Sequence, residues 1–197
     1  MYELQNQQQQ KRGAYKVTTA PASEPLSLTE VKSYLKVDNT VDDTLITLLI
    51  QSAREEAESY TNQRLMPQTV TEIFNSFPVE RYLCLSLSPI VAVSSINYTD
   101  EDDSNQLLAS SNYVVHTQSM PPLVTLAYNE VWPITLNEGQ TVTVVYTVGY
   151  ADADSVPGSI RNAMLKMIAQ NYERREESIK QLPTDAQQLL MYNRVTV

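Results

Sequence analysis

Apolar residues recur at three- and four-residue steps across residues 41–62, which is the period of one face of an α-helix. Thr40 and Asp43 have the spacing of a capping box, and carboxylates in a first turn complement the helix dipole. We therefore expect a long amphipathic helix with an acidic start. Its predicted inward face consists of Leu45, Leu48, Leu49, Ser52, Ala53, Ala57 and Tyr60.

Two further helices are predicted by the same period. "SLTE" at Ser27 is a capping box and opens a helix over 27–36. Pro157 suits a first helical turn and opens a helix over 156–176. The apolar stripes of these helices need apolar partners, and the simplest arrangement packs the helices on one another. The inward residues are Leu28, Val31 and Leu35 in the first, and Ile160, Ala163, Met164, Met167, Ile168 and Tyr172 in the second.

Between the long helices the period changes to two. Six short alternating runs follow one another over 66–150, separated by clusters of Pro, Asp, Asn, Ser or Gly, and this pattern predicts an antiparallel β insertion, as a meander or a small barrel. The runs are "TVTEIF", "YLCLSL", "VAVSSINY", "NYVVHT", "LVTLAY" and "TVTVVYTVGY". The last run alternates most clearly and should bury the face made by Val142, Val144, Tyr146, Val148 and Tyr150.

Both ends of the chain differ from the central region 24–180. Residues 1–23 begin with a polar, Gln-rich stretch without periodicity, so we expect a flexible arm. Pro183 separates a tail, residues 181–197, with a short helix around 186–192 that is too short to be stable alone. The tail must dock on its own subunit or on a partner. The expected fold class is α+β: a small helical bundle of two N-terminal helices and a long C-terminal helix, an antiparallel β insertion, and extended N- and C-terminal arms.

Composition restricts the functional classes. Cys84 and His116 are the sole residues of their types, so a thiolate or imidazole metal cluster and an intrachain disulfide are excluded. The net charge is −9, and residues 37–155 hold sixteen Asp and Glu against three Arg. Such an acidic region repels a phosphate backbone, which argues against a DNA-binding module. No apolar run is long enough to cross a bilayer, and the N-terminus lacks a secretion signal.

The sequence offers little chemistry for catalysis. The acidic stretch from Asp38 lacks the glycine and the final glutamate that a calcium loop needs, and "TDEDDSNQ" is typical of a solvated hairpin tip. His116 lies in a strand pattern and is interpreted as structural. Asp152 and Asp154 form a possible acid–base pair, but their position before a helix favours capping. We expect no catalytic residues, no metal and no cofactor.

Three stretches together resemble a known family. They are "PLSLTEVKSYLKVD", "DDTLITLLIQSAREEAESYTNQRL" and "VTVVYTVGYADADSVPGSIRNAMLKMIAQNYERREES". Their order and spacing are similar to those of the head–tail connector (adaptor) proteins of long-tailed double-stranded DNA bacteriophages, over roughly residues 24–180. The resemblance implies a non-enzymatic virion protein, made in the host cytoplasm and located in the neck between capsid and tail.

The resemblance also implies partners. Identical subunits would form a ring, usually a dodecamer, that docks beneath the portal protein, receives a stopper or tail-completion protein, and lets double-stranded DNA pass without specific binding. The C-terminal tail would contact the portal through Leu189, Leu190, Met191, Tyr192, Val195 and Val197. Candidate acidic channel or loop residues are Asp38, Asp42, Asp43, Asp100, Glu101, Asp102 and Asp103. The alternatives are another neck ring protein, such as a stopper or tail terminator, and a small carboxylate-dependent hydrolase.

Overall fold

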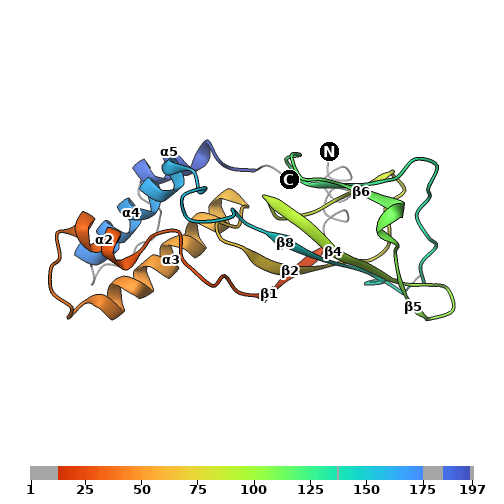
Figure 1. The fold of residues 1–197 in the computed structure, drawn as a ribbon, viewed down its shortest axis with the longest axis horizontal. Helices are drawn as coiled ribbons and strands as arrows, with labels where there is room; N and C mark the ends of the chain where they lie inside the picture. Colours follow the sequence, from red (N-terminus) through yellow and green to blue (C-terminus); the bar gives the residue numbers. More distant parts are fainter. Residues whose placement is uncertain (1–12, 137, 175–183, 196–197) are drawn as a thin grey trace. The chain divides into compact units, whose positions relative to one another are not determined.

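The structure, a computed structural model, describes residues 13–136, 138–174 and 184–195 (Figure 1). The chain divides into two compact units. Unit 1 contains the described residues up to Ala20 together with Pro67–Gly149, and unit 2 contains the described residues of Pro21–Met66 and Tyr150–Val195. Unit 1 carries the strands and unit 2 carries the helices.

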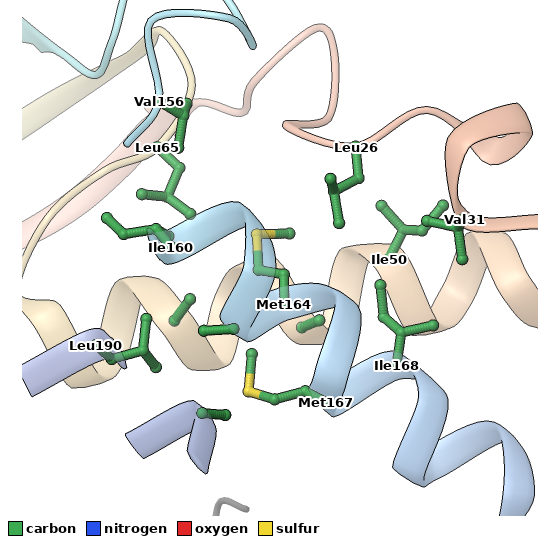
Figure 2. Packing of buried hydrophobic residues seen from close by; sticks show 14 of the residues in the cluster. Leu26, Val31, Ile50, Leu65, Val156, Ile160, Met164, Met167, Ile168 and Leu190 are labelled. Carbon is green, nitrogen blue, oxygen red and sulfur yellow. The ribbon is translucent and has the colours of Figure 1, made fainter. Parts of the chain in front are cut away.

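Unit 2 is a bundle of helices. Its elements are α2 (Leu28–Leu35), α3 (Asp43–Thr61), α4 (Gly158–Glu173) and α5 (Thr184–Met191), and α4 packs against both α3 and α5. Figure 2 shows the side chains of α4 directed into the shared core. The predicted inward residues of α4 from Ile160 to Ile168 are all buried, which confirms its apolar stripe. The core consists mainly of Leu26, Val31, Ile46, Ile50, Ala53, Ala57, Leu65, Ile160, Met164, Met167, Ile168 and Leu190.

The buried face of α3 is shifted from the predicted one, although Ala53 and Ala57 are buried as predicted. Ile46 and Ile50 are buried, whereas Leu48 is 61% exposed. Five of the six residues 45–50 are apolar, so periodicity alone cannot choose between adjacent stripes. The second half of the helix determines which stripe is buried, because Arg54 and Glu58 are buried there as an ion pair and continue the Ile46–Ile50 face.

The two predicted capping boxes have different outcomes. Ser27 is the N-cap of α2, and its hydroxyl accepts a hydrogen bond from the amide of Glu30 at 3.2 Å. The box predicted for α3 is wrong: the N-cap is Asp42, without a side-chain cap, and the carboxylate of Asp43 instead binds Lys32 at 2.6 Å. The ammonium of Lys32 competes successfully for the carboxylate because it offers full charge pairing.

Unit 1 contains two antiparallel sheets. The five-stranded sheet has the order β1-β2-β8-β4-β5, and the three-stranded sheet has the order β3-β7-β6. The strands are β1 (Ala14–Thr19), β2 (Gln68–Phe74), β3 (Tyr82–Cys84), β4 (Ile90–Thr99), β5 (Asn105–Leu107), β6 (Tyr113–His116), β7 (Leu123–Leu126) and β8 (Val142–Val148). Each of the six predicted runs contains a strand. One core joins residues of both sheets, including Val70, Phe74, Leu83, Val124, Val144 and Tyr146.

Strand β1 differs from the expectation of an arm. Residues 14–19 pair antiparallel with β2, with Ala14 opposite Ile73 and Val17 opposite Val70, although all six side chains are exposed. Main-chain hydrogen bonds at a sheet edge need no buried side chains, so β1 forms without an alternating pattern. Residues 1–12 lie outside the described part of the chain. The α+β fold class, with its helical bundle and antiparallel β insertion, is confirmed.

Candidate interaction surfaces

The predicted tail residues have very different environments. Helix α5 lies in unit 2, where Leu190 is fully buried and Val195 is 6% exposed. Val195 is also held through its backbone: its amide donates to the carbonyl of Thr61 at 2.9 Å, and its carbonyl accepts from the side chain of Asn62 at 3.0 Å. These two residues therefore fold back onto their own subunit.

Other tail residues remain accessible. Met191 is 64% exposed and Tyr192 is 87% exposed, whereas Leu189 is half-buried against the core of unit 2. Val197 lies outside the described residues. Portal binding by the tail stays a prediction, and in the described chain Met191 and Tyr192 have the exposure that docking requires.

The acidic residues at the start of α3 are tied to neighbouring helices. The hydroxyl of Tyr172 in α4 donates to the carboxylate of Asp42 at 2.7 Å, and Asp43 pairs with Lys32 of α2. Asp38 is exposed. Asp42 and Asp43 thus position helices, while Asp38 retains the exposure expected of a channel or loop residue.

The loop Asp100–Asp103 forms the tip of the hairpin between β4 and β5. Asp100 organises the tip, because its carboxylate accepts hydrogen bonds from the amides of Asp102 at 3.1 Å and Ser104 at 2.9 Å and from the side chain of Gln106 at 2.9 Å. Hydrogen bonding to the amide of Ser104, supported by Gln106, lowers the pKa of Asp100. Glu101, Asp102 and Asp103 are exposed. This geometry is that of an Asx-type turn carrying solvated acids.

The residues weighed for catalysis make local contacts. His116 lies 2.7 Å from the hydroxyl of Thr125 on the neighbouring strand. Asp152 accepts a hydrogen bond from the amide of Ser155 at 2.8 Å in the turn before α4, and hydrogen bonds from Ser155 lower its pKa. Asp154 is 97% exposed and lies 3.5 Å from Arg161. Among the described residues, no group of His, Cys, Asp or Glu has the arrangement of a metal site.

Unit 1 contains a fully buried carboxylate that was not among the predicted site residues. Glu72 of β2 accepts hydrogen bonds from the amide and the hydroxyl of Ser86 and from the hydroxyl of Tyr146, the last at 2.6 Å. The amide of Gly13 also donates to it, and burial raises the pKa of Glu72. The alternation along β2 could have revealed it. Glu72 lies two residues from both Val70 and Phe74, so its side chain points into the same core.

A second buried charge cluster lies in unit 2. Arg54 contacts Glu24 at 2.8 Å and Glu58 at 3.3 Å, and Arg64 lies 3.7 Å from Glu58. Glu58 also accepts a hydrogen bond from the amide of Leu65 at 2.9 Å. The cluster joins the segment before α2, the helix α3 and the chain that follows it. Each buried charge is paired with an opposite charge, as burial requires, so we interpret the cluster as structural.

A family model described as "head completion protein" matches residues 24–183. No curated protein matches the sequence. In the part of the chain that the structure describes, none of the helices has the length and apolar character needed to cross a membrane.

Solved structures share the fold at low sequence identity. A chain in "Neck of empty GTA particle computed with C6 symmetry" aligns with a TM-score of 0.78 at 17% identity, covering 93% of this chain and 96% of that one. A chain in "Virion of native gene transfer agent (GTA) particle" aligns with a TM-score of 0.78 at 18% identity and the same coverage. A third, in "Neck of native GTA particle computed with C12 symmetry", gives 0.77 at 16% identity. Since the family model spans most of the chain, the protein belongs to the head completion protein family.

Proposed function

We propose that this protein is a structural subunit of the neck of a tailed virus-like particle, where it forms an adaptor ring between the capsid portal and the tail. The observation that carries the proposal is the match of the head completion family model to residues 24–183. The shared fold with chains from necks of gene transfer agent particles supports it, over 93% of this chain. We assign no enzymatic role.

We infer that copies of the chain assemble into a closed ring, with twelve subunits as the expected number. Support for that number comes from a neck of similar fold that was computed with C12 symmetry. A closed ring requires a head-to-tail contact in which two different surfaces of the subunit meet. We place these surfaces on α4 and on the β unit.

The charge distribution suits a conduit. DNA that must slide through a ring should not be held by its phosphates, and an acidic lining prevents this through repulsion. Asp38 and the Asp100–Asp103 tip supply exposed or partly exposed acid. We propose that Asp38 and the Asp100–Asp103 tip each face the channel, whereas Asp42 and Asp43 act mainly within the helical bundle.

The tail is the proposed contact with the portal. Met191 and Tyr192 present large apolar surface at the end of α5 while Leu190, their neighbour, anchors the helix in the core. An apolar pair on an anchored helix end can bury its area on a partner at little entropic cost. A stopper or tail-completion protein would dock on the opposite side of the ring.

The proposal is tested by genetics, in the genome that encodes the protein and the other parts of the particle. Deleting the gene should leave heads that are filled with DNA but lack tails, and expression of the tagged protein should restore joining. Electron microscopy of the restored particles should locate the tag at the head–tail junction, in a ring. Tag density in the tail tube or at its far end would contradict the adaptor assignment, and density below a separate ring would favour the stopper alternative.

A further inference from the structure

Unit 1 carries exposed apolar side chains on two neighbouring loops. Val79, in the segment between β2 and β3, is fully exposed at 102%. Tyr128, Val131 and Ile134, in the segment between β7 and β8, are 98%, 76% and 69% exposed. We call these four residues the loop patch. Several large apolar side chains exposed on adjoining loops indicate an interaction site more often than a single exposed residue does.

The backbone beneath the loop patch is held in place. The guanidinium of Arg81 donates to the carbonyl of Ala127 at 2.8 Å and to that of Glu130 at 3.0 Å, which fixes the turn carrying Tyr128. The indole of Trp132 donates to the carbonyl of Glu80 at 2.8 Å, which joins the second loop to the first. The loops therefore present their apolar side chains from a preorganised surface, which reduces the ordering cost of binding.

Two hollows adjoin the patch on the two loops. Trp132 stacks on Phe77 with ring centroids 4.8 Å apart and an interplanar angle of 8°. Phe77 lines a hollow of about 310 Å³ together with Val79 and Tyr82, and it lines another of about 510 Å³ together with Ile134. Apolar side chains of a partner could enter these hollows beside Phe77.

The charges around the patch specify the partner further. Glu80, Glu130 and Glu138 lie on the same two loops. Among the described residues of these loops the one basic side chain is Arg81, and it donates hydrogen bonds to backbone carbonyls. A second copy that offered the same surface would oppose these carboxylates with its own. Charge complementarity therefore favours a segment in which apolar side chains are flanked by lysine or arginine.

We propose that the loop patch is the docking site for another neck protein, which contributes an apolar segment with basic flanks. This inference rests on the proposed function, since it presumes that the protein is a neck subunit. It is independent of the tail, because the patch lies wholly in unit 1 and Met191 and Tyr192 lie in unit 2.

The chain contains its own reporter for the test. Trp132 is the only tryptophan in the sequence, and it lies beneath the patch. The full-length protein is titrated with each of the other neck proteins of the same particle, purified separately, and the emission of Trp132 is followed. We expect one of them to shift the emission, with an affinity that falls as salt concentration rises.

Variants locate the contact. Replacing Val79, Tyr128 and Ile134 together by serine should weaken binding at least about tenfold, and the pair E130Q and E138Q should weaken it and reduce its salt dependence. The matched control is V41S with L48S, which removes two exposed apolar side chains from unit 2. It should bind as the wild type does.

Several results would overturn the inference. Unchanged binding of the triple serine variant to every neck protein would do so, as would a failure of all of them to bind. An emission shift that depends on the concentration of this protein alone would instead assign the patch to contacts between copies. Absence of the tagged protein from purified necks would remove the proposed function itself, whereas its presence there with an inert patch would remove this inference only.

Discussion

Tyr146 donates its hydroxyl to Oε2 of Glu72 at 2.6 Å, and both side chains are completely buried in unit 1. The remaining hydrogen bonds to this carboxylate come from Ser86 and from the amide of Gly13. All of these donors are uncharged. Glu72 therefore joins β2 to β8, to the chain after β3 and to the start of β1.

Removing the phenolic hydroxyl should destabilise unit 1. We expect Tyr146→Phe to lower the free energy of unfolding by about 1–2 kcal/mol, because one donor to a buried carboxylate is lost while the ring continues to fill its space. Urea unfolding at pH 7 measures the effect. Tyr128→Phe is the matched control, since Tyr128 is 98% exposed, and it should leave the stability unchanged.

The buried carboxylate should also make stability depend on pH. Burial raises the pKa of Glu72 above its ordinary value of 4.5 in the folded protein. The folded state then holds the proton more tightly than the unfolded state. The protonated group therefore contributes fully to the free energy of unfolding below the ordinary pKa, and this contribution is lost as pH rises through the folded pKa. The glutamine of Glu72→Gln cannot ionise, so the stability of this variant does not fall for this reason as pH rises.

The measurement is urea unfolding of both proteins from pH 4 to pH 8. We expect the stability of Glu72→Gln relative to the wild type to increase as pH rises above the ordinary pKa and to level off above the folded pKa. Because the other titrating groups are common to both proteins, the difference isolates Glu72. A difference that stays constant across the range would show that Glu72 has the same pKa in both states.

Gly13 should be intolerant of a side chain. A Cβ at this position would lie 2.6 Å from Cγ of Glu72 and 2.7 Å from the carbonyl oxygen of Ile73, so the start of β1 would have to move. We expect Gly13→Ala to speed hydrogen exchange at the paired amides of β1. Gly158→Ala is the control, because nothing lies within 4 Å of its added Cβ. Equal exchange in both variants would refute the close approach.

The sequence was informative where burial produces a period. Alternation predicted six strands of the β insertion, and the step of three and four predicted α4 with its buried stripe. It could not predict β1 or β5, because every side chain of these edge strands is exposed. Main-chain pairing and tertiary contacts form such strands, and neither leaves a pattern in the hydrophobic positions.

Buried polar groups explain why the inward face of α3 was predicted incorrectly. Arg54 and Glu58 look like surface residues in a sequence, yet their mutual contact places them on the inner face of α3 and shifts the apolar stripe to Ile46 and Ile50. Among the candidate site residues, Leu190 and Tyr192 have the same apolar character in the sequence. Packing against α4 makes the first part of the core and leaves the second exposed.

The acidic hairpin tip should keep the protein from binding DNA. We expect the wild type to bind duplex DNA poorly at physiological salt, and we expect lysine substitution of Glu101, Asp102 and Asp103 together to produce salt-sensitive binding. Fluorescence anisotropy with a labelled duplex measures both. Asp100 is left unchanged because it accepts the hydrogen bonds that shape the tip.

The same substitutions test the proposed channel. Particles assembled with the lysine variant should release their DNA more slowly than wild-type particles, because the ring would then attract phosphates. A control variant with lysine at Thr44 and Gln51, exposed residues of α3, adds positive charge to unit 2 and leaves the tip unchanged. Normal release from particles that carry the tip variant would place the hairpin outside the channel.

The tail requires a test that separates docking from folding. Deleting residues 184–197 would remove Leu190 from the core and the backbone bond between Val195 and Thr61, so we expect the truncated protein to lose stability as well as any docking function. Substitution of Met191 and Tyr192 by serine avoids this, because both side chains are exposed. The double variant should unfold at the same urea concentration as the wild type yet fail to attach to DNA-filled heads, as judged by sedimentation with the heads. Leu48→Ser, which changes an exposed apolar residue of the same unit, should attach normally. If the double variant attaches as firmly as the wild type, the end of α5 is not the portal anchor and serves only to close the core of unit 2.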